Sequence, residues 1–354
     1  MRRIASKITA RLFIFLYLLF VASCANGPDR ISVSQPVSAA SIQEIYVSSA
    51  RLPSIDAVNF RQDRTLRTKF AKFDVSIPPS HSLGQVEWPR GEADAATDFT
   101  VVAQRNIDDS SGFINALHQE PGDEVAVFVH GYNTTPSEAL YRFAQVSHDF
   151  EFDVPGILYA WPSAGRATGY VYDRDSVLFS RDPLADLLTE ISRNTNKKIR
   201  LMAHSMGSHL AMEVLRQLVI TGRRDVLDDL SVVVLLAPDI DPDIFRSQAN
   251  TIGTLPDPFI IMTSRSDRAL KLSAILNIGR QKVGDLSRAA DVEGLNVTVF
   301  DFTSLADGSN RDHLVPLTSP AAITVLRDLV KSDRRGEVDL SQFKVGEDGV
   351  IRTR

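Results

Sequence analysis

The chain has 354 residues, of which 44% are hydrophobic and 23% are charged, and its formal net charge is -5. This composition is ordinary for a globular protein with a substantial core, and the length exceeds one minimal domain without clearly requiring two. No dense Lys/Arg block follows the first dozen residues. Because phosphate binding needs a concentrated basic surface, the sequence argues against a nucleic-acid partner.

The first two dozen residues have the pattern of an export signal. Four basic residues among the first eleven precede an unbroken apolar run at 12–22. As a helix this run spans about 16 Å, roughly half of a bilayer core, which is too short for a transmembrane helix and suits a signal peptide. We therefore predict that residues 1–23 are a signal peptide and that the protein is exported.

Cys24 is the one cysteine of the chain, so an intramolecular disulfide is excluded. The stretch Val21-Ala22-Ser23-Cys24 resembles the lipobox of bacterial lipoproteins, in which cleavage precedes the cysteine and the thiol is lipidated. The resemblance implies a membrane partner: a lipid anchor at Cys24 would hold the protein in the bacterial cell envelope, facing the periplasm. An ordinary signal or an uncleaved anchor is the alternative. Residues 24–41, rich in Ser, Pro, Gly and Asn, would then form a flexible tether.

Strand-like patterns begin after this tether. Partial alternation of apolar and polar side chains predicts half-exposed strands at 42–47, 70–77 and 98–103. From residue 124 the pattern changes to short, almost wholly apolar runs, which are typical of strands buried on both faces. These runs lie at 124–130, 156–161, 198–203, 231–237, 259–263 and 297–302.

Helical patterns separate most of these buried strands, at 137–150, 183–193, 208–221 and 320–331. Strands that alternate with helices indicate a mostly parallel sheet with helices on both faces, and the three earlier strands fit an antiparallel N-terminal entry to it. We therefore predict a single α/β domain over residues 42–332, followed by a polar C-terminal tail over 333–354.

The stretch Ala203-His204-Ser205-Met206-Gly207 lies between a predicted buried strand and a predicted helix. It matches the nucleophile elbow G-x-S-x-G, except that Ala203 replaces the first glycine. Small residues flank the serine there because the turn is too tight for larger side chains. A serine at a helix start is otherwise a common cap, but the strand–turn–helix setting favours the elbow. We predict that Ser205 is a nucleophile.

A hydroxyl nucleophile needs a general base whose pKa lies near neutrality, which means a histidine. Of the seven histidines, four precede Ser205, and His204 and His209 flank it on a turn from which they cannot reach its Oγ. His313 remains, in a loop between the last predicted strand and the last predicted helix. It also obeys the order serine, acid, histidine of α/β-hydrolases, so we predict that His313 is the base.

At 128–133, 160–163, 203–207 and 237–239 the chain resembles the α/β-hydrolase superfamily, and within it a little-characterised bacterial branch whose members are called esterase-like. The resemblance covers roughly residues 120–331 and implies the α/β-hydrolase fold. It also implies an oxyanion hole formed by the backbone N–H groups of Tyr132 and Met206. Trp161 would either line the acyl pocket or only close its strand.

The acid of a catalytic triad has three main candidates, and Asp307 and Asp312 are weaker ones. Asp267 follows the predicted strand at 259–263, where the superfamily carries its acid, and would orient His313 and stabilise the imidazolium. Asp239 and Asp241 follow the preceding strand and are the rivals, because some hydrolases take their acid from that position.

These residues predict a serine hydrolase that cleaves a small-molecule ester through an acyl-enzyme, as a carboxylesterase or lipase does. A thioesterase or peptidase is the next choice, and the competing class is a non-catalytic envelope lipoprotein that uses the fold for binding. No cofactor is predicted, because the chain has neither a Walker motif nor a Gly-rich dinucleotide fingerprint. No metal is predicted either: residues 239–243 have the spacing that opens an EF-hand loop, but Ile244 occupies the position of its glycine.

Overall fold

The computed structural model describes residues 30–53, 60–264, 270, 282–285, 292–305, 312–334, 343–346 and 349–353. Cys24, the predicted signal peptide and Asp267 lie outside these ranges. Within them, no helix combines the length and the apolar character that crossing a bilayer requires.

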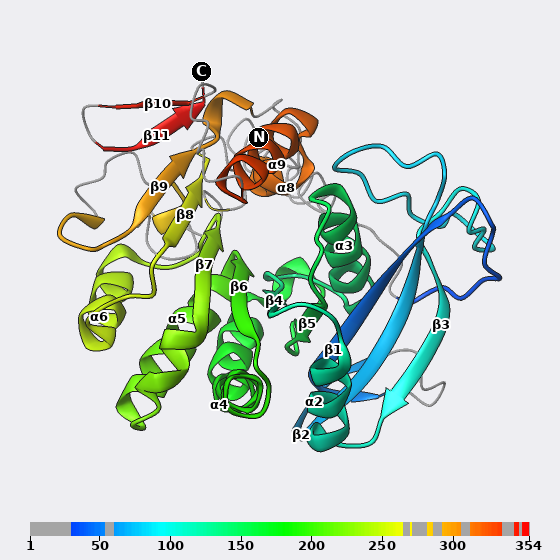
Figure 1. Ribbon diagram of the computed structural model, residues 1–354, viewed down its shortest axis with the longest axis horizontal. Coiled ribbons are helices and arrows are strands. Elements are labelled where there is room, and N and C mark those ends of the chain that lie inside the picture. The colour runs from blue at the N-terminus through cyan, green and yellow to red at the C-terminus, as the bar shows by residue number, and fades with distance from the viewer. Residues whose placement is uncertain are drawn as a thin grey trace, which may run out of the picture.

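An eleven-stranded sheet runs through the molecule in the order β10-β11-β9-β8-β7-β6-β4-β5-β1-β2-β3 (Figure 1). Its parallel centre comprises β4 (Glu124–Val129), β5 (Gly156–Ala160), β6 (Lys198–His204), β7 (Leu230–Leu236), β8 (Phe259–Thr263) and β9 (Thr298–Asp301). β1 (Ser41–Pro53) pairs parallel with β5 and antiparallel with β2 (Phe60–Ile77), and β2 pairs antiparallel with β3 (Thr100–Ile107). The mostly parallel sheet with antiparallel N-terminal strands confirms the predicted fold class.

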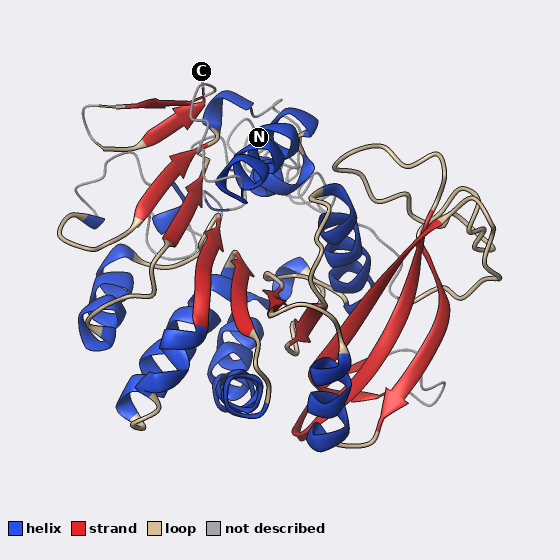
Figure 2. Cartoon of the chain, in the orientation of Figure 1, coloured by secondary structure: helices blue, strands red, loops and turns tan. Residues whose placement is uncertain are grey.

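Helices cover both faces of the sheet, as Figures 1 and 2 show. One face carries α2 (Ser110–Gln119), α4 (Tyr170–Asn194), α5 (Met206–Ile220) and α6 (Pro242–Ile252). The other carries α3 (Pro136–Asp149), α8 (Val315–Thr318) and α9 (Pro320–Arg334). Alternate side chains of β4 enter two separate cores: Val127 packs toward α4 and α5, and Phe128 packs toward α3. The architecture is that of an α/β-hydrolase.

Short 3₁₀ helices complete the described elements. They are η2 (Ala167–Gly169), η3 (Arg224–Asp229), η4 (Val283–Asp285), η6 (Thr303–Leu305) and η7 (Asp312–Leu314). The last of them, η7, contains His313 and leads directly into α8.

Helix α4 begins thirteen residues before Pro183, where the sequence pattern predicted its start. The reason is that the first half of α4 turns polar side chains inward: Asp173, Ser176 and Ser180 are fully buried. Such a face carries no hydrophobic periodicity, so the pattern could not reveal it.

The two predicted flanking segments also contact the domain. Ile31 is buried, and residues 32–34 exchange backbone hydrogen bonds with Val101 of β3. At the other end, β10 (Phe343–Val345) pairs with β11 (Ile351–Thr353), which joins β9 in parallel. Both segments contain few apolar residues. Their composition therefore predicted a tether at the N-terminal end and a loose tail at the C-terminal end.

The strand order reverses beside β4, because β5 lies on one side of it and β6 on the other. In open α/β sheets, the crevice for ligands opens at such a switch point, outside the carboxyl ends of the strands. The segments that follow β4 and β6 are residues 130–135 and the turn at Ser205. The fold therefore brings the two predicted parts of the site to the same edge of the sheet.

Candidate active site

Ser205 occupies a sharp turn between β6 and α5, with φ 53° and ψ -121°. A non-glycine residue in this region is strained by about 1–3 kcal/mol and persists only where its surroundings hold it. The backbone N–H of Ser205 donates to the carbonyl oxygen of Leu236 at 2.9 Å, which ties the turn to the end of β7. The residue is 3% exposed. The turn has the geometry of a nucleophile elbow.

Gly207 is the second requirement of this turn. A Cβ at this position would lie 2.3 Å from the carbonyl oxygen of His130 and 2.6 Å from that of Val129. Both contacts are to backbone that is fixed by β4, so no larger side chain fits. The glycine lets the first turn of α5 approach the end of β4.

The loop after β4 passes directly over the elbow. A Cβ on Gly131 would lie 2.5 Å from Nδ1 of His204 and 3.0 Å from Cβ of Ser205. Among the described residues, the backbone N–H groups of Tyr132 and Met206 donate to no other group. Backbone N–H groups without an acceptor among the described residues are the kind of donor that an oxyanion hole uses.

His130 and Trp161 support this loop from below. Their rings stack with centroids 5.0 Å apart, and Nε1 of Trp161 donates to the carbonyl oxygen of His130 at 2.7 Å. Burial, with a smaller effect of Arg51, lowers the pKa of His130 to about 3, so its ring is neutral. Trp161 is fully buried, which favours a role in closing the strand over one in lining the acyl pocket.

His313 is half-buried, and its ring centroid lies 4.6 Å from that of His204. Nε2 of His204 lies 3.4 Å from the carbonyl oxygen of His313. Since His204 directly precedes Ser205, the contact brings the His313 segment to the elbow. Burial, followed by the proximity of His313, lowers the pKa of His204 well below its usual value. His204 is therefore a neutral spacer between the loop at Gly131 and the predicted base.

The rival acids have other partners. Oδ1 of Asp239 lies 2.9 Å from Nζ of Lys282, and its Oδ2 accepts from the hydroxyl of Tyr170 at 3.1 Å. Both side chains of the ion pair are buried, and Asp239 raises the pKa of Lys282 although burial opposes the charge. Asp241 caps α6 by accepting from the N–H of Asp243 at 2.9 Å. These contacts give each of the two carboxylates a structural role.

A buried polar cluster supports the His313 segment from the opposite side. Nε2 of Gln145 donates to the carbonyl oxygen of Leu317 at 3.2 Å and also to Asp149. Asp149 in turn lies 2.8 Å from Nε2 of His81, whose Nδ1 lies 2.8 Å from Glu87. Burial opposes the charge of His81, but these two carboxylates raise its pKa to about 9.

The same cluster contains side chains that could bind a metal ion. Ligand atoms of His81, His148 and Asp149 lie within 4.8 Å of one another. Both ring nitrogens of His81 already face carboxylate oxygens at 2.8 Å, as in an imidazolium held between two anions. The ion pairs account for this arrangement without a metal.

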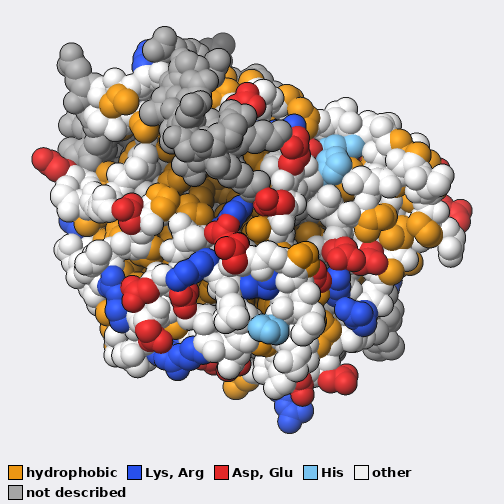
Figure 3. Space-filling model, viewed as in Figure 1, with side chains coloured by type: hydrophobic (Ala, Val, Ile, Leu, Met, Phe, Trp, Pro, Cys, Tyr) orange, Lys and Arg blue, Asp and Glu red, His pale blue; other side chains and the backbone are white. Residues whose placement is uncertain are grey.

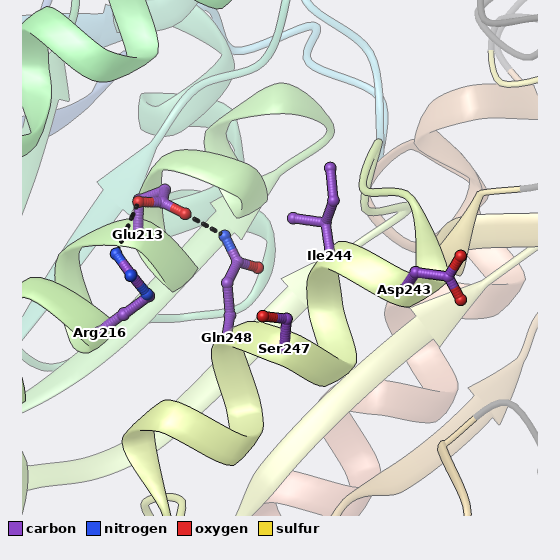
Figure 4. Close-up of a pocket in the computed structure, with 6 residues that line it drawn as sticks. All are labelled: Glu213, Arg216, Asp243, Ile244, Ser247 and Gln248. Carbon is purple, nitrogen blue, oxygen red and sulfur yellow. Dashed lines mark hydrogen bonds and ion pairs between the residues drawn. The ribbon is translucent and has the colours of Figure 1, made fainter.

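A shallow groove lies where α5 and α6 meet, bridged by a hydrogen bond from Nε2 of Gln248 to Glu213 at 2.7 Å (Figure 4). Its lining mixes acidic, basic and neutral polar residues with one apolar residue: Glu213, Arg216, Asp243, Ile244, Ser247 and Gln248. Glu213 lies about two helical turns beyond the elbow, so the groove is separate from Ser205. On the face shown in Figure 3, acidic and basic side chains are interspersed.

Two buried charges beneath the loop at residues 131–135 were not found from the sequence. Asp173 of α4 accepts from the N–H of Asn133 at 3.1 Å, and Arg51 of β1 donates to the carbonyl oxygen of Thr134 at 3.3 Å. Neither residue belongs to a motif, and a charged side chain gives no sign in the sequence that it will be buried.

Comparison with known proteins places the chain in a family. Residues 106–332 match the model of the family described as "Alpha/beta hydrolase of unknown function (DUF900)". Uncharacterized protein alr1448 of Nostoc sp. (strain PCC 7120 / SAG 25.82 / UTEX 2576) is 29% identical over 133 residues, which are 30% of this chain and 35% of that protein. The match thus spans about a third of that relative.

Solved structures with partial similarity have low sequence identity. Lipase B of Aspergillus fumigatus is 13% identical with a TM-score of 0.42, over 66% of this chain and 60% of that one. A dienelactone hydrolase of Anabaena variabilis is 12% identical with a TM-score of 0.38, over 84% and 99%. An esterase of Pyrobaculum calidifontis is 10% identical with a TM-score of 0.35, over 85% and 87%. Similarity at this level says nothing about the substrate.

Proposed function

Because the chain belongs to an α/β-hydrolase family of unknown function, we propose that it is a serine hydrolase that cleaves an ester of a small molecule, as carboxylesterases and lipases do. In this proposal Ser205 attacks the ester carbonyl while His313 accepts its proton, and Asp267 orients His313. The backbone N–H groups of Tyr132 and Met206 stabilise the oxyanion. Water, activated by His313, then hydrolyses the acyl-enzyme.

The observation that carries this proposal is the strained backbone of Ser205. A protein that only binds a partner gains nothing from holding a serine at φ 53°, whereas a nucleophile elbow needs that conformation to present the hydroxyl. The N–H groups of Tyr132 and Met206, which donate to no other described residue, and the contact between His204 and the His313 segment support the same chemistry. A thioesterase or peptidase would use the same groups, but no contact of the described residues favours either.

A fluorophosphonate probe tests the proposal because it phosphonylates activated serines. We expect stoichiometric labelling of the wild type and none of Ser205→Ala. Ser208→Ala is the matched control: Ser208 lies in the first turn of the same helix, where its Oγ donates to the carbonyl oxygen of Ala203 at 2.9 Å. Well-folded wild type that does not react would favour the non-catalytic binding protein. Hydrolysis of p-nitrophenyl esters of increasing chain length would then distinguish a carboxylesterase from a lipase-like enzyme.

The membrane anchor remains a separate proposal. If Cys24 is lipidated, the chain from residue 24 to Ile31, which packs on the domain, spans at most about 25 Å when fully extended. The lipid would therefore keep the domain close to the membrane surface. Labelling of cells with a radioactive fatty acid tests this: we expect label on the wild type and none on Cys24→Ser. Label on both variants, or on neither, would contradict the anchor.

A further inference from the structure

The loop at residues 131–135 is held by hydrogen bonds on both sides of the N–H group of Tyr132. That N–H belongs to the peptide between Gly131 and Tyr132, whose carbonyl oxygen lies 2.9 Å from Nδ1 of His130. In the next peptide, the oxygen of Tyr132 accepts from Oγ1 of Thr134 at 3.1 Å, and the N–H of Asn133 donates to Asp173 at 3.1 Å. The direction of the Tyr132 N–H is therefore set by its neighbours.

The conformation of the loop is strained at one residue. Asn133 has φ 54°, in the left-handed region that asparagine tolerates better than most residues but that still costs energy. A strained residue relaxes unless its surroundings hold it. The contact that holds Asn133 is its N–H bond to the carboxylate of Asp173.

Asp173 is fully buried in the first turn of α4. It accepts three hydrogen bonds: from the N–H of Asn133, from Oγ of Ser163 at 2.7 Å and from the N–H of Ala164 at 2.6 Å. Two of these donors belong to the segment after β5, and one belongs to the loop after β4. The carboxylate thus joins the loop to a rigid neighbouring strand end.

Arg51 is the second buried charge and reaches the same place from β1. It donates to the carbonyl oxygens of Trp161 at 3.1 Å, Ser163 at 2.9 Å and Thr134 at 3.3 Å. Ser163 therefore links the two charges, since its carbonyl binds Arg51 and its hydroxyl binds Asp173. Burial lowers the pKa of Arg51 to about 10, while Asp173 opposes this shift, so the guanidinium is charged at neutral pH.

Burial raises the pKa of Asp173, while its hydrogen bonds and Arg51 oppose this shift. Burying charged side chains costs desolvation energy, so Asp173 and Arg51 add little to stability, but the hydrogen bonds that offset this cost can favour one arrangement of the groups they bind. Here those groups are the backbone of residues 133–134 and of the segment after β5. We propose that Asp173 and Arg51 are positioning residues that aim the N–H of Tyr132 at the oxyanion beside Ser205. This inference rests on the proposed hydrolase function.

The test compares Asp173→Asn with Asp175→Asn, a matched control two residues along α4 with an exposed side chain. Asparagine cannot accept from all three donors of Asp173, because one of its two terminal atoms is itself a donor. We expect Asp173→Asn to slow phosphonylation of Ser205 about 10- to 100-fold, because a displacement of about 1 Å costs up to about 100-fold in rate. We expect kcat to fall with KM within about threefold, because the N–H acts on the transition state.

Hydrogen–deuterium exchange supplies a readout that does not depend on catalysis. In Asp173→Asn, the amides of residues 130–135 should exchange faster, while β6, β7 and α5 keep wild-type protection. Ser163→Ala removes no charge but removes the hydroxyl that donates to Asp173 and accepts from the N–H of Thr134 at 3.1 Å, so it should loosen the same residues. It also keeps the test decisive if Asp173→Asn does not fold.

The outcomes are separable. Local loosening with slower phosphonylation in Asp173→Asn and Ser163→Ala, but not in Asp175→Asn, supports the inference. Wild-type reactivity and exchange in the first two variants would overturn it, as would loosening spread evenly over the domain, which indicates a general loss of stability. If the wild type does not react with the probe, the proposed function fails, and the exchange data alone then decide whether Asp173 holds the loop.

Discussion

The nucleophile side of the candidate site (residues 128–135 and 203–207) and its base side (residues 312–318) are held in different ways. On the nucleophile side, two strand ends, a glycine in backbone contact and two buried charges fix the chain. The base side meets its surroundings through the rings of His204 and His313, through Gln145, which binds Leu317, and through Gly84, where a Cβ would lie 2.1 Å from the carbonyl oxygen of Thr318. Behind Gln145 lies His81, a group that titrates.

The two sides of the site have different structural requirements. An oxyanion hole works because its donors are aimed before the reaction starts, which requires a rigid backbone. A general base must accept and return a proton, and needs only to be kept within reach of the nucleophile. Substitutions on the two sides should therefore fail in different ways, and the following changes test this.

The largest effect should come from the base itself. We expect His313→Gln to lower kcat by about 10⁴-fold or more, because no other group takes the proton of Ser205. The melting temperature should change little, since His313 is only half-buried. Steady-state kinetics and thermal denaturation check this, with His118→Gln on the exposed face of α2 as control. Activity within tenfold of wild type would remove His313 from the mechanism.

The next effect distinguishes the acids. We expect Asp267→Asn to lower kcat by about 10⁴-fold, the size of the loss when the acid of a catalytic triad is replaced by its amide. Asp239→Asn should instead destabilise the fold by about 3 kcal/mol, because the buried Lys282 loses its partner, and should leave kcat within tenfold for folded protein. The reverse pattern would transfer the role of acid to Asp239. Urea denaturation and kinetics on both variants decide.

A third change breaks the nucleophile side. Gly207→Ala places a methyl group 2.3 Å from the carbonyl oxygen of His130, and neither backbone can move without disturbing a strand. We expect a loss of about 3 kcal/mol in unfolding free energy, the upper range for overpacking, together with loss of activity. Gly112→Ala in α2 is the control, because the nearest atom there is a side-chain methyl at 3.2 Å. Equal stability of the two variants would show that the close approach at Gly207 is not maintained in solution.

The last change concerns pH and the base side. The pKa of His81 is raised to about 9 from a usual 6.5. Its contribution to the unfolding free energy is therefore fully present below pH 6.5 and is lost as pH rises through 9. At 1.36 kcal/mol per pKa unit, the unfolding free energy of the wild type should fall by at most about 3 kcal/mol between pH 6.5 and 10. His81→Gln should be less stable at pH 6.5 and should lack this dependence. Urea denaturation at both pH values measures it, and an unchanged slope in His81→Gln would contradict the assignment.

Much of the molecule could be read from local patterns. The apolar runs gave the parallel strands because a strand buried on both faces has no polar positions, and the small residues around Ser205 gave the elbow because its turn excludes larger ones. The start of α4 could not be read, since Asp173, Ser176 and Ser180 face inward and break the periodicity. Helix α2, which follows β3 directly, was likewise missed among polar neighbours.

By itself, the sequence determined the fold class and the position of Ser205 on a strand–turn–helix, and it predicted His313 as the base among seven histidines, because each depends on local pattern or chain order. Tertiary structure alone decided which charges lie beneath the loop at residues 131–135, that Lys282 neutralises Asp239, and that His204 separates this loop from His313. These contacts join residues far apart in the chain, and whether a charge is buried depends on what packs over it.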